Sequence, residues 1–516
     1  MTQKEALSLI KTGVSVFLTG EAGSGKTHII NRYTEYLREH EIDFAVTAST
    51  GIAATHIHGM TIHSWSGIGV HQALNDDDLQ HIAENRYVAK RIKKAKVLII
   101  DEISMLDGNT LTLVERVCRK IRKLQLPFGG LQVVLVGDFF QLPPVAAQGR
   151  GVEFAFDSDA WQGLMPTVCY LTEQHRQEDS VFLGILSAIR NNTFDEMHFE
   201  SLSGRIISPA ELPDDMPRLF SHNANVDTIN SAELRKLPGK TRLFVMAVRG
   251  PEALTDALIR GCLSPERLEL KEGATVMFTK NNASEGFVNG TLGTVVSFDS
   301  EKHYPIVKTS DGARIATEPM EWMIAEGDEV FAKITQLPLR LAWAMTIHKS
   351  QGVSLDSAVM DLSQTFEYGQ GYVALSRVRN LSGVHLLGVN ARAFQVHPLV
   401  SDKDEQFRVA SLVAEHEQED LSEARQKELE KNFITLSGGR QKKEKTAKRK
   451  KASLDGQPLE KNRAVHPQAY QRWTPEEDEK LRKCWSQGVQ IRAIAETFGR
   501  KRGAISSRLK KLGLSQ

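Results

Sequence analysis

The sequence predicts an α/β fold with parallel sheets, and three observations support this prediction. Short apolar runs rich in β-branched residues occur at 14–18, 96–100 and 132–136, which is typical of strands buried on both faces. The first run is followed by apolar residues at helical spacing, from Ile29 to Leu37. Glycine and polar residues follow directly at the ends of these runs, where parallel α/β sheets gather their ligand groups.

At 516 residues the chain is too long for one hydrophobic core, and we expect three or four compact units. Hydrophobic residues make up 41% and charged residues 25%, as in ordinary soluble globular proteins. No apolar run is long enough to cross a membrane and no signal-peptide core is present, so we expect no membrane association. We expect a cytoplasmic protein, near the nucleoid in a bacterium, or one in the nucleus or mitochondrion of a eukaryote. The four cysteines lie far apart, which predicts neither disulfides nor a zinc site.

The net charge of +1 hides an uneven distribution. Residues 440–516 contain 21 lysines and arginines against 8 aspartates and glutamates, whereas residues 1–439 contain 44 against 56. A basic tail on a mildly acidic body indicates a polyanionic partner for the tail. A merely solubilising tail is the simpler alternative.

Residues 20–27 read GEAGSGKT, which fits the phosphate-loop pattern of two glycines separated by four residues and followed by Lys and Thr. The glycines let the backbone close around the phosphates of a nucleoside triphosphate, and the amide groups and helix N-terminus face their negative charge. Lys26 is expected to contact the β- and γ-phosphates, and Thr27 to ligate Mg²⁺. A chance match is the alternative, but a strand before the loop and a helix after it argue against chance. The predicted nucleotide-binding residues of the loop are Gly20, Glu21, Ala22, Gly23, Ser24, Gly25, Lys26, Thr27 and His28.

Other segments supply the remaining groups of a nucleotide site. The second apolar run ends in Asp101 and Glu102, of which Asp101 is expected to hold Mg²⁺ through water and Glu102 to polarise the attacking water. The third run leads to Gln141, whose amide is placed to sense a γ-phosphate. Gln3, upstream of the first strand, is either a surface residue or a reader of the adenine edge, which we prefer. Arg176 is either a surface charge or a guanidinium aimed at the γ-phosphate from a second domain.

Two further segments carry donors suited to a phosphodiester backbone. A predicted strand at 45–48 runs into small and hydroxylated residues, and a cluster at 346–350 combines hydroxyl, imidazole and ammonium groups in one turn. Such groups contact nucleic acid without regard to base sequence. A plain turn at 49–54 and a core histidine at position 348 are the structural alternatives. The residues expected to contact a nucleic-acid backbone are Thr50, Gly51, His63, Thr346, His348 and Lys349.

Seven segments resemble, in order, the successive motifs of superfamily 1 helicases. They are GEAGSGKT, TASTGIAATHIHGMTIHS, LIIDEIS, VVLVGDFFQLPPV, LTEQHRQ, AWAMTIHKSQGVSLDSAVMDL and YVALSRVR. The pattern is most similar to the PIF family (petite integration frequency), in the branch that also holds RecD-like enzymes, and it covers about residues 1–395. The resemblance implies two RecA-like lobes with ATP between them, single-stranded DNA across both, and movement in the 5′→3′ direction. It places Arg377 where the family has an arginine finger.

The domain organisation follows from these motifs and from composition. We expect a first RecA-like domain at 1–165 with a small insertion at about 66–95, and a second at 166–270 and 335–395. Five short strand-like runs within 271–334, separated by tight turns, predict a small β-barrel insertion. The family has a Src-homology-like barrel here that helps hold a DNA strand, and a purely structural excursion is the alternative. A charged and basic linker is expected at 396–469, with helix in part of 400–437.

A three-helix module is predicted at 470–516. Residues 474–477, TPEE, form a capping box with proline at the first helical position, and glycines at 488, 499 and 513 end the three helices. The pattern resembles a Myb/SANT-like or bacterial helix-turn-helix module, which would bind duplex DNA, and a protein-docking bundle is the alternative. The basic residues expected to hold phosphates are Arg500, Lys501, Arg502, Arg508, Lys510 and Lys511.

Together these features predict an ATP-dependent 5′→3′ DNA helicase. We expect a monomer that acts on single-stranded and forked DNA in replication, repair or genome maintenance, telomeres included. Glu102 would act as the general base and Gln141 would couple the γ-phosphate to motion, while Lys26, Arg176 and Arg377 stabilise transition-state charge. The alternatives are a RecD-like or RNA-directed translocase, and a nucleotide-switched clamp that binds DNA without unwinding it.

Overall fold

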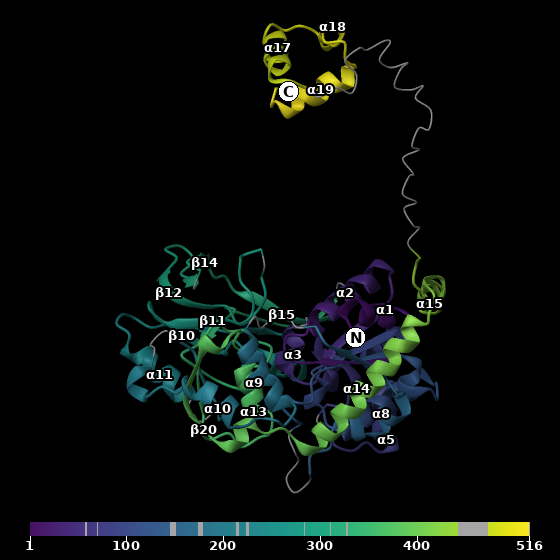
Figure 1. Cartoon of the computed structure of the whole chain (residues 1–516), viewed down its shortest axis with the longest axis vertical. Coiled ribbons are helices and arrows are strands. Elements are labelled where there is room, and N and C mark those ends of the chain that lie inside the picture. Colours follow the sequence, from purple (N-terminus) through teal and green to yellow (C-terminus); the bar gives the residue numbers. More distant parts are fainter. Residues whose placement is uncertain are drawn as a thin grey trace. The chain divides into compact units, whose positions relative to one another are not determined.

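The computed structural model divides into two compact units, Met1–Gln441 and Lys442–Gln516 (Figure 1). Among the helices that the structure describes, none is long and apolar enough to cross a membrane. The described residues are 1–56, 59–69, 71–144, 151–173, 179–212, 216–222, 226–282, 284–309, 311–326, 329–441 and 473–514.

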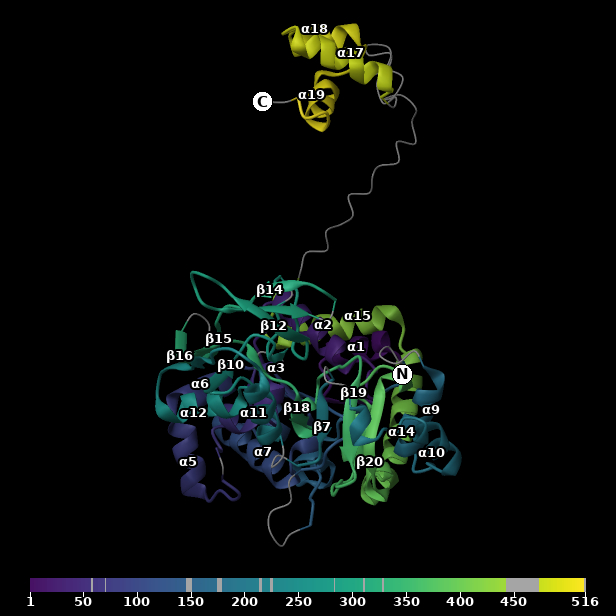
Figure 2. The same ribbon diagram turned by 90° about the vertical axis from the view of Figure 1, so that its left-hand side faces the viewer.

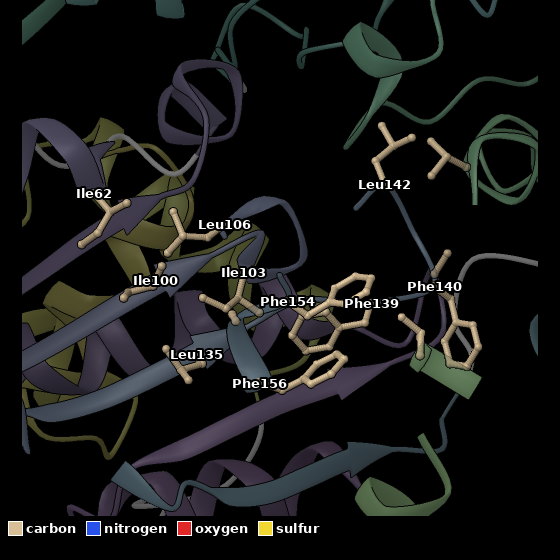
Figure 3. Close-up of a cluster of buried hydrophobic side chains, with 14 of the residues drawn as sticks. Ile62, Ile100, Ile103, Leu106, Leu135, Phe139, Phe140, Leu142, Phe154 and Phe156 are labelled. Atoms are coloured by element: carbon tan, nitrogen blue, oxygen red, sulfur yellow. The ribbon is translucent and has the colours of Figure 1, made fainter. Parts of the chain in front are cut away.

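The first lobe is built on a six-stranded parallel sheet with the order β3-β2-β4-β5-β1-β6. Side chains alternate between its two faces: Val16 and Leu18 pack under α1 and α2, whereas Phe17 packs with α7 and α8. Figure 3 shows the second face, where Ile100 and Leu135 belong to one apolar cluster with Ile103 and with phenylalanines that follow the strands. The strands are β1 (Val16–Gly20), β2 (Phe44–Ala48), β3 (Met60–Thr61), β4 (Val97–Asp101), β5 (Gln132–Val136) and β6 (Thr167–Leu171). The helices are α1 (Gln3–Lys11), α2 (Lys26–Glu39), α3 (Gly51–His56), α4 (Ile62–Ser66), α5 (Asp76–Glu84), α6 (Arg86–Lys94), α7 (Gly108–Arg122) and α8 (Asp159–Leu164).

The predicted boundary at residue 165 is wrong, because β6 pairs in parallel with β1 and completes the first sheet. Cys169 and Leu171 of β6 are buried in the same core as α1 and α2. The predicted insertion at about 66–95 contains α5 and α6, which pack against α7.

The second lobe has a four-stranded parallel sheet with the order β18-β7-β19-β20 (Figure 2). This confirms a second α/β lobe with a parallel sheet. Its strands are β7 (Arg218–Phe220), β18 (Ala344–Thr346), β19 (Ala358–Leu362) and β20 (Val384–Val389). The helices in this part of the chain are α9 (Ser180–Arg190), α10 (Glu196–Ser203), α11 (Val226–Lys236) and α13 (Gln370–Leu375).

The insertion in the second lobe is larger than predicted and forms three antiparallel sheets. All five predicted strands are present, but β16 pairs with β15 and β9 in a separate sheet, and β17 completes the five-stranded sheet instead. The predicted limits of 271–334 are therefore wrong, because strands from 242 to 341 pair with one another. The elements are β8 (Arg242–Val245), β9 (Ala247–Arg249), α12 (Glu252–Gly261), β10 (Arg267–Leu270), β11 (Thr275–Phe278), β12 (Leu292–Phe298), β13 (Pro305–Thr309), β14 (Arg314–Ala316), β15 (Met320–Glu326), β16 (Glu329–Gln336) and β17 (Leu339–Leu341).

Two helices after the second lobe return to the first lobe, α14 (Pro398–Glu419) and α15 (Glu423–Leu436). Phe407 of α14 lies 5.0 Å from Phe17 and 6.1 Å from Phe139 between ring centroids, and Phe433 of α15 joins the core beneath α1. Figure 1 shows α14 crossing the first lobe. The predicted helix within 400–437 is confirmed. The predicted linker from residue 396 is wrong for residues 398–441, here called the strap, because widely spaced apolar residues of this segment pack into the cores of the first lobe.

Residues 473–514 of the second unit form the three predicted helices: α17 (Pro475–Ser486), α18 (Ile491–Thr497) and α19 (Arg502–Lys511). Thr474 and Glu477 make the predicted capping box at the start of α17. The module has a small core of its own, made of Leu481, Ile494, Ala495, Ile505 and Leu509.

The strap should contribute to the stability of the first lobe. Phe407→Ala removes a ring packed among four aromatic side chains and should cost about 3–5 kcal/mol, which lowers the melting temperature by several degrees. Leu412→Ala on the exposed side of α14 is the matched control and should change little. Differential scanning fluorimetry of the full chain measures both, and equal melting temperatures for the two variants would contradict this role.

Candidate active site and nucleic-acid interface

The loop between β1 and α2 has the geometry of a phosphate cradle. Gly23 and Gly25 adopt φ angles of 93° and 88°, in the left-handed region that favours glycine. A Cβ on Gly20 would lie 2.8 Å from the Leu171 carbonyl oxygen, so only glycine fits there. The Lys26 ammonium donates to the carbonyl oxygens of Gly20 at 2.8 Å and Glu21 at 3.0 Å, which holds it over the loop.

Gln3 lies against this loop, as its predicted role requires. Its side-chain amide donates to the Ser24 carbonyl oxygen at 3.0 Å, and its backbone amide donates to the Glu173 carboxylate at 2.8 Å. The capping box formed by Thr2 and Glu5 begins α1 at this point and fixes the position of Gln3. The contact of Gln3 with adenine remains a prediction.

Two carboxylates lie at the end of β4, Asp101 as its last residue and Glu102 directly after it, and Lys26 is near both. The Glu102 backbone amide donates to the Asp101 carboxylate at 2.9 Å, and Glu102 has a φ of 52°, which turns the chain sharply at the strand end. Burial raises the pKa of Asp101. Burial, with the nearby charge of Asp101, raises the pKa of Glu102 to about 7, while Lys26 and Arg377 act in the opposite direction. A carboxylate with a pKa near the working pH is suited to general-base catalysis.

A residue that the sequence analysis missed joins the two lobes at this point. Gln351, which follows β18 in the second lobe, donates from its amide to the Glu102 carboxylate at 3.0 Å and to the Gln141 side-chain oxygen at 3.4 Å. It therefore links the predicted base to the predicted γ-phosphate sensor. The sequence could have indicated this role of Gln351, because it lies in the segment TIHKSQG, at the same strand end as the predicted DNA contacts.

Arg377 lies two residues after the end of α13 and is buried and hydrogen-bonded. It is 2% exposed, and its guanidinium donates to the Val373 carbonyl oxygen at 2.8 Å, to the Ser376 hydroxyl at 2.8 Å and to the Ser350 carbonyl oxygen at 3.4 Å. Its charge is close enough to lower the pKa of Glu102. The second predicted arginine, Arg176, lies outside the described residues.

A buried ionic network that the sequence did not predict surrounds Asp138, which follows β5. Arg190 of α9 donates to the Asp138 carboxylate at 2.6 Å and to the Tyr170 hydroxyl at 2.8 Å, and its guanidinium lies 3.7 Å from Asp404 of α14. The Tyr372 hydroxyl donates to Asp138 at 3.5 Å and accepts from the backbone amide of Ala22 at 3.3 Å. The network therefore connects the phosphate loop, both lobes and the strap.

Comparison with known proteins identifies the family. A family model described as PIF1-like helicase matches residues 1–206, and one described as the 2B domain of DNA helicase Pif1 matches residues 254–298. The ATP-dependent DNA helicase Pif1 of Psychrobacter sp. is 40% identical over 499 residues, which cover 85% of this chain and 75% of that protein. The chain belongs to the PIF1-like helicase family.

Solved Pif1 structures share the fold. Pif1 from Bacteroides sp. in complex with ADP-AlF4 is 30% identical with a TM-score of 0.69, and the match covers 79% of this chain and 96% of that one. Bacteroides Pif1 in complex with ADP-AlF3 and single-stranded DNA matches at the same identity and coverage with a TM-score of 0.58.

The predicted DNA contacts of the first lobe lie around α3 and α4. The Thr50 hydroxyl accepts from the Ala53 backbone amide at 3.2 Å and so caps α3. Gly51 packs directly against the backbone of Gly261 in α12, where a side chain would clash. Burial lowers the pKa of His63, which keeps the imidazole neutral at physiological pH.

The predicted DNA contacts of the second lobe share one turn after β18. Thr346 is buried, and its hydroxyl accepts from the Lys349 backbone amide at 3.3 Å, so it holds the turn in shape. His348 and Lys349 are half-buried, and burial lowers the pKa of both. Because Gln351 ends the same turn, these groups are structurally joined to the ATP site.

Replacing the predicted base tests the site directly. Glu102→Gln should lower the ATPase kcat by roughly 10²–10⁴-fold with little change in ATP binding, because an amide cannot accept the proton of water. The wild-type kcat should fall as the pH drops below about 7, since only ionised Glu102 acts as a base and its pKa is raised to about 7. Steady-state ATPase assays across pH measure both effects, with Glu405→Gln on the exposed side of α14 as control. Turnover near the wild-type rate in Glu102→Gln would refute the assignment.

Proposed function

We propose that this PIF1-like helicase moves 5′→3′ along single-stranded DNA and separates forked duplexes, with ATP hydrolysis as the energy source. We propose that it acts as a monomer in the cytoplasm, and that its carboxy-terminal module has a separate partner. The observation that carries the proposal is the hydrogen bond between Gln351 of the second lobe and Glu102 of the first. Binding or hydrolysis of ATP at Glu102 would act directly on this contact, and so on the relation between the lobes.

The residues of the site fit ATP hydrolysis. Lys26 and Arg377 bring positive charge from opposite lobes to the place where the β- and γ-phosphates would lie, and Glu102 would accept a proton from the attacking water. Thr27 follows Lys26 in the chain, and Lys26 is close enough to Asp101 for its charge to act on the pKa of that carboxyl. The hydroxyl of Thr27 and the carboxylate of Asp101 are oxygen ligands of the kind that Mg²⁺ prefers. Bound there, Mg²⁺ would neutralise phosphate charge. Gln141 would report the presence of the γ-phosphate through its contact with Gln351.

The coupling to DNA follows from the shape of one short turn. His348, Lys349 and Gln351 lie within four residues, so a displacement of Gln351 at the ATP site also displaces the predicted DNA contacts. Alternate opening and closing of the interlobe interface would then move single-stranded DNA stepwise.

Strand-displacement assays test polarity and substrate together. A duplex with a single-stranded 5′ tail should be unwound with ATP, whereas the same duplex with a 3′ tail should not. A 5′ RNA tail should be used poorly, and Lys26→Ala should unwind neither substrate. Preference for the 3′ tail would refute the polarity, faster unwinding from the RNA tail would favour the RNA-directed alternative, and ATP hydrolysis without any strand separation would favour the clamp.

A further inference from the structure

Two arginines of the carboxy-terminal module bind carboxylates within the module itself. Arg500 is 3% exposed, donates to the Glu477 carboxylate at 3.1 Å and lies 4.4 Å from the Trp473 ring. Arg508 donates to the Asp478 carboxylate at 2.7 Å and lies on the same ring at 5.7 Å. Their predicted role as phosphate contacts is therefore wrong, because both tie the last helix and its preceding turn to the start of the module.

The basic residues that remain lie on one exposed surface of α19. Its buried side holds Ile505 and Leu509, and the opposite side, here called the cationic face, is exposed. Helical spacing brings its members together at intervals of three and four residues. The cationic face consists of Arg502, Gly503, Ser506, Ser507, Lys510 and Lys511.

The cationic face contains only basic residues, serines and glycine. It contains no carboxylate, because the acidic residues among 473–514 lie on α17 and at position 496 of α18. Its centre holds Ser506 and Ser507, and Gly503 follows Arg502 at the amino-terminal end, so small side chains permit close approach of the helix backbone between the cations at the two ends of α19. The preceding turn also carries the exposed Lys501, which adds a further cation at the amino-terminal end.

A protein-docking surface would have a different composition. Such surfaces are anchored by exposed aromatic and large apolar side chains, which supply most of the binding energy. Within residues 473–514 no large apolar side chain is strongly exposed. The surface instead matches the phosphate chains on either side of a DNA groove, because it presents cations and hydroxyl donors with little bulk between them.

The arrangement of the helices agrees with this match. Gly499, with a φ of 57°, turns the chain between α18 and α19, and the two helices pack on one another as in a helix-turn-helix. In that motif the second helix lies in the major groove, which admits one α-helix. We propose that α19 binds duplex DNA in the major groove, with Arg502, Lys510 and Lys511 on phosphates and the two serines at base edges.

This proposal goes beyond the motor function and does not depend on its polarity. The motor would hold single-stranded DNA while the module of the same chain holds duplex DNA. Each contact would then raise the effective concentration for the other, and a forked substrate would be bound more tightly than either of its parts.

The test compares two triple variants of the full chain that remove equal charge. Arg502→Ala, Lys510→Ala and Lys511→Ala together change the cationic face, whereas Lys480→Ala, Arg482→Ala and Lys483→Ala change exposed residues of α17. Binding of a blunt duplex of about two helical turns is measured by fluorescence anisotropy at several salt concentrations. The first variant should bind at least about tenfold more weakly and lose about three units of salt slope, at roughly 0.9 per phosphate contact.

The control variant should keep most of its affinity and slope, and ATPase stimulation by single-stranded DNA should be unchanged in both. Failure of the motor proposal would appear in that ATPase readout instead, so the two proposals fail separately. Unchanged duplex binding in the first variant, or an equal loss in both, would overturn the assignment of α19. Unchanged duplex binding together with loss of a protein partner would establish the docking alternative.

Discussion

The buried ion pair between Asp138 and Arg190 fixes the geometry on which the motor depends. Both side chains are at most 1% exposed, and Arg190 also lies 4.1 Å from the Phe140 ring. Removing one partner of such a pair leaves an uncompensated buried charge and typically costs about 3–5 kcal/mol. Asp138 belongs to the segment that carries Gln141, so the pair determines where the predicted γ-phosphate sensor lies. Asp404 makes the strap part of the same network.

From this fixed point a short series of contacts crosses the interlobe interface. The Gln141 side-chain amide donates a hydrogen bond to the Asp138 carboxylate at 3.5 Å. The Gln351 amide in turn donates to the Gln141 side-chain oxygen and to the Glu102 carboxylate. The pKa of Glu102 reflects a balance in which burial and neighbouring carboxylates favour the protonated acid, while cations from both lobes favour the ionised base. Because Arg377 comes from the second lobe, the position of that lobe affects the reactivity of the first. This is a physical route by which DNA could control ATP hydrolysis.

Local patterns in the sequence predicted local structure well. The strand, loop and helix around Lys26, the turn after Asp101 and the three helices of the module each depend on neighbouring residues. The pairing of strands that are distant in sequence was not predictable in this way. The apolar run of β6 would suit the sheet of either lobe, and only its pairing with β1 in the structure assigns it to the first lobe. Buried Arg190 and paired Arg508 look like surface arginines in sequence, because the carboxylates that neutralise them are far away in the chain. The strap was missed for a related reason, since its few apolar residues are separated by many charged ones.

The central claim is that groups from both lobes must meet for ATP to be hydrolysed, and that DNA controls this meeting. The most direct measurement is the steady-state ATPase rate with and without saturating single-stranded DNA, for the wild type and for Arg377→Ala. We predict strong stimulation of the wild type by DNA, and loss of the stimulated rate in Arg377→Ala while DNA binding persists. A wild-type rate that is the same with and without DNA would contradict the account.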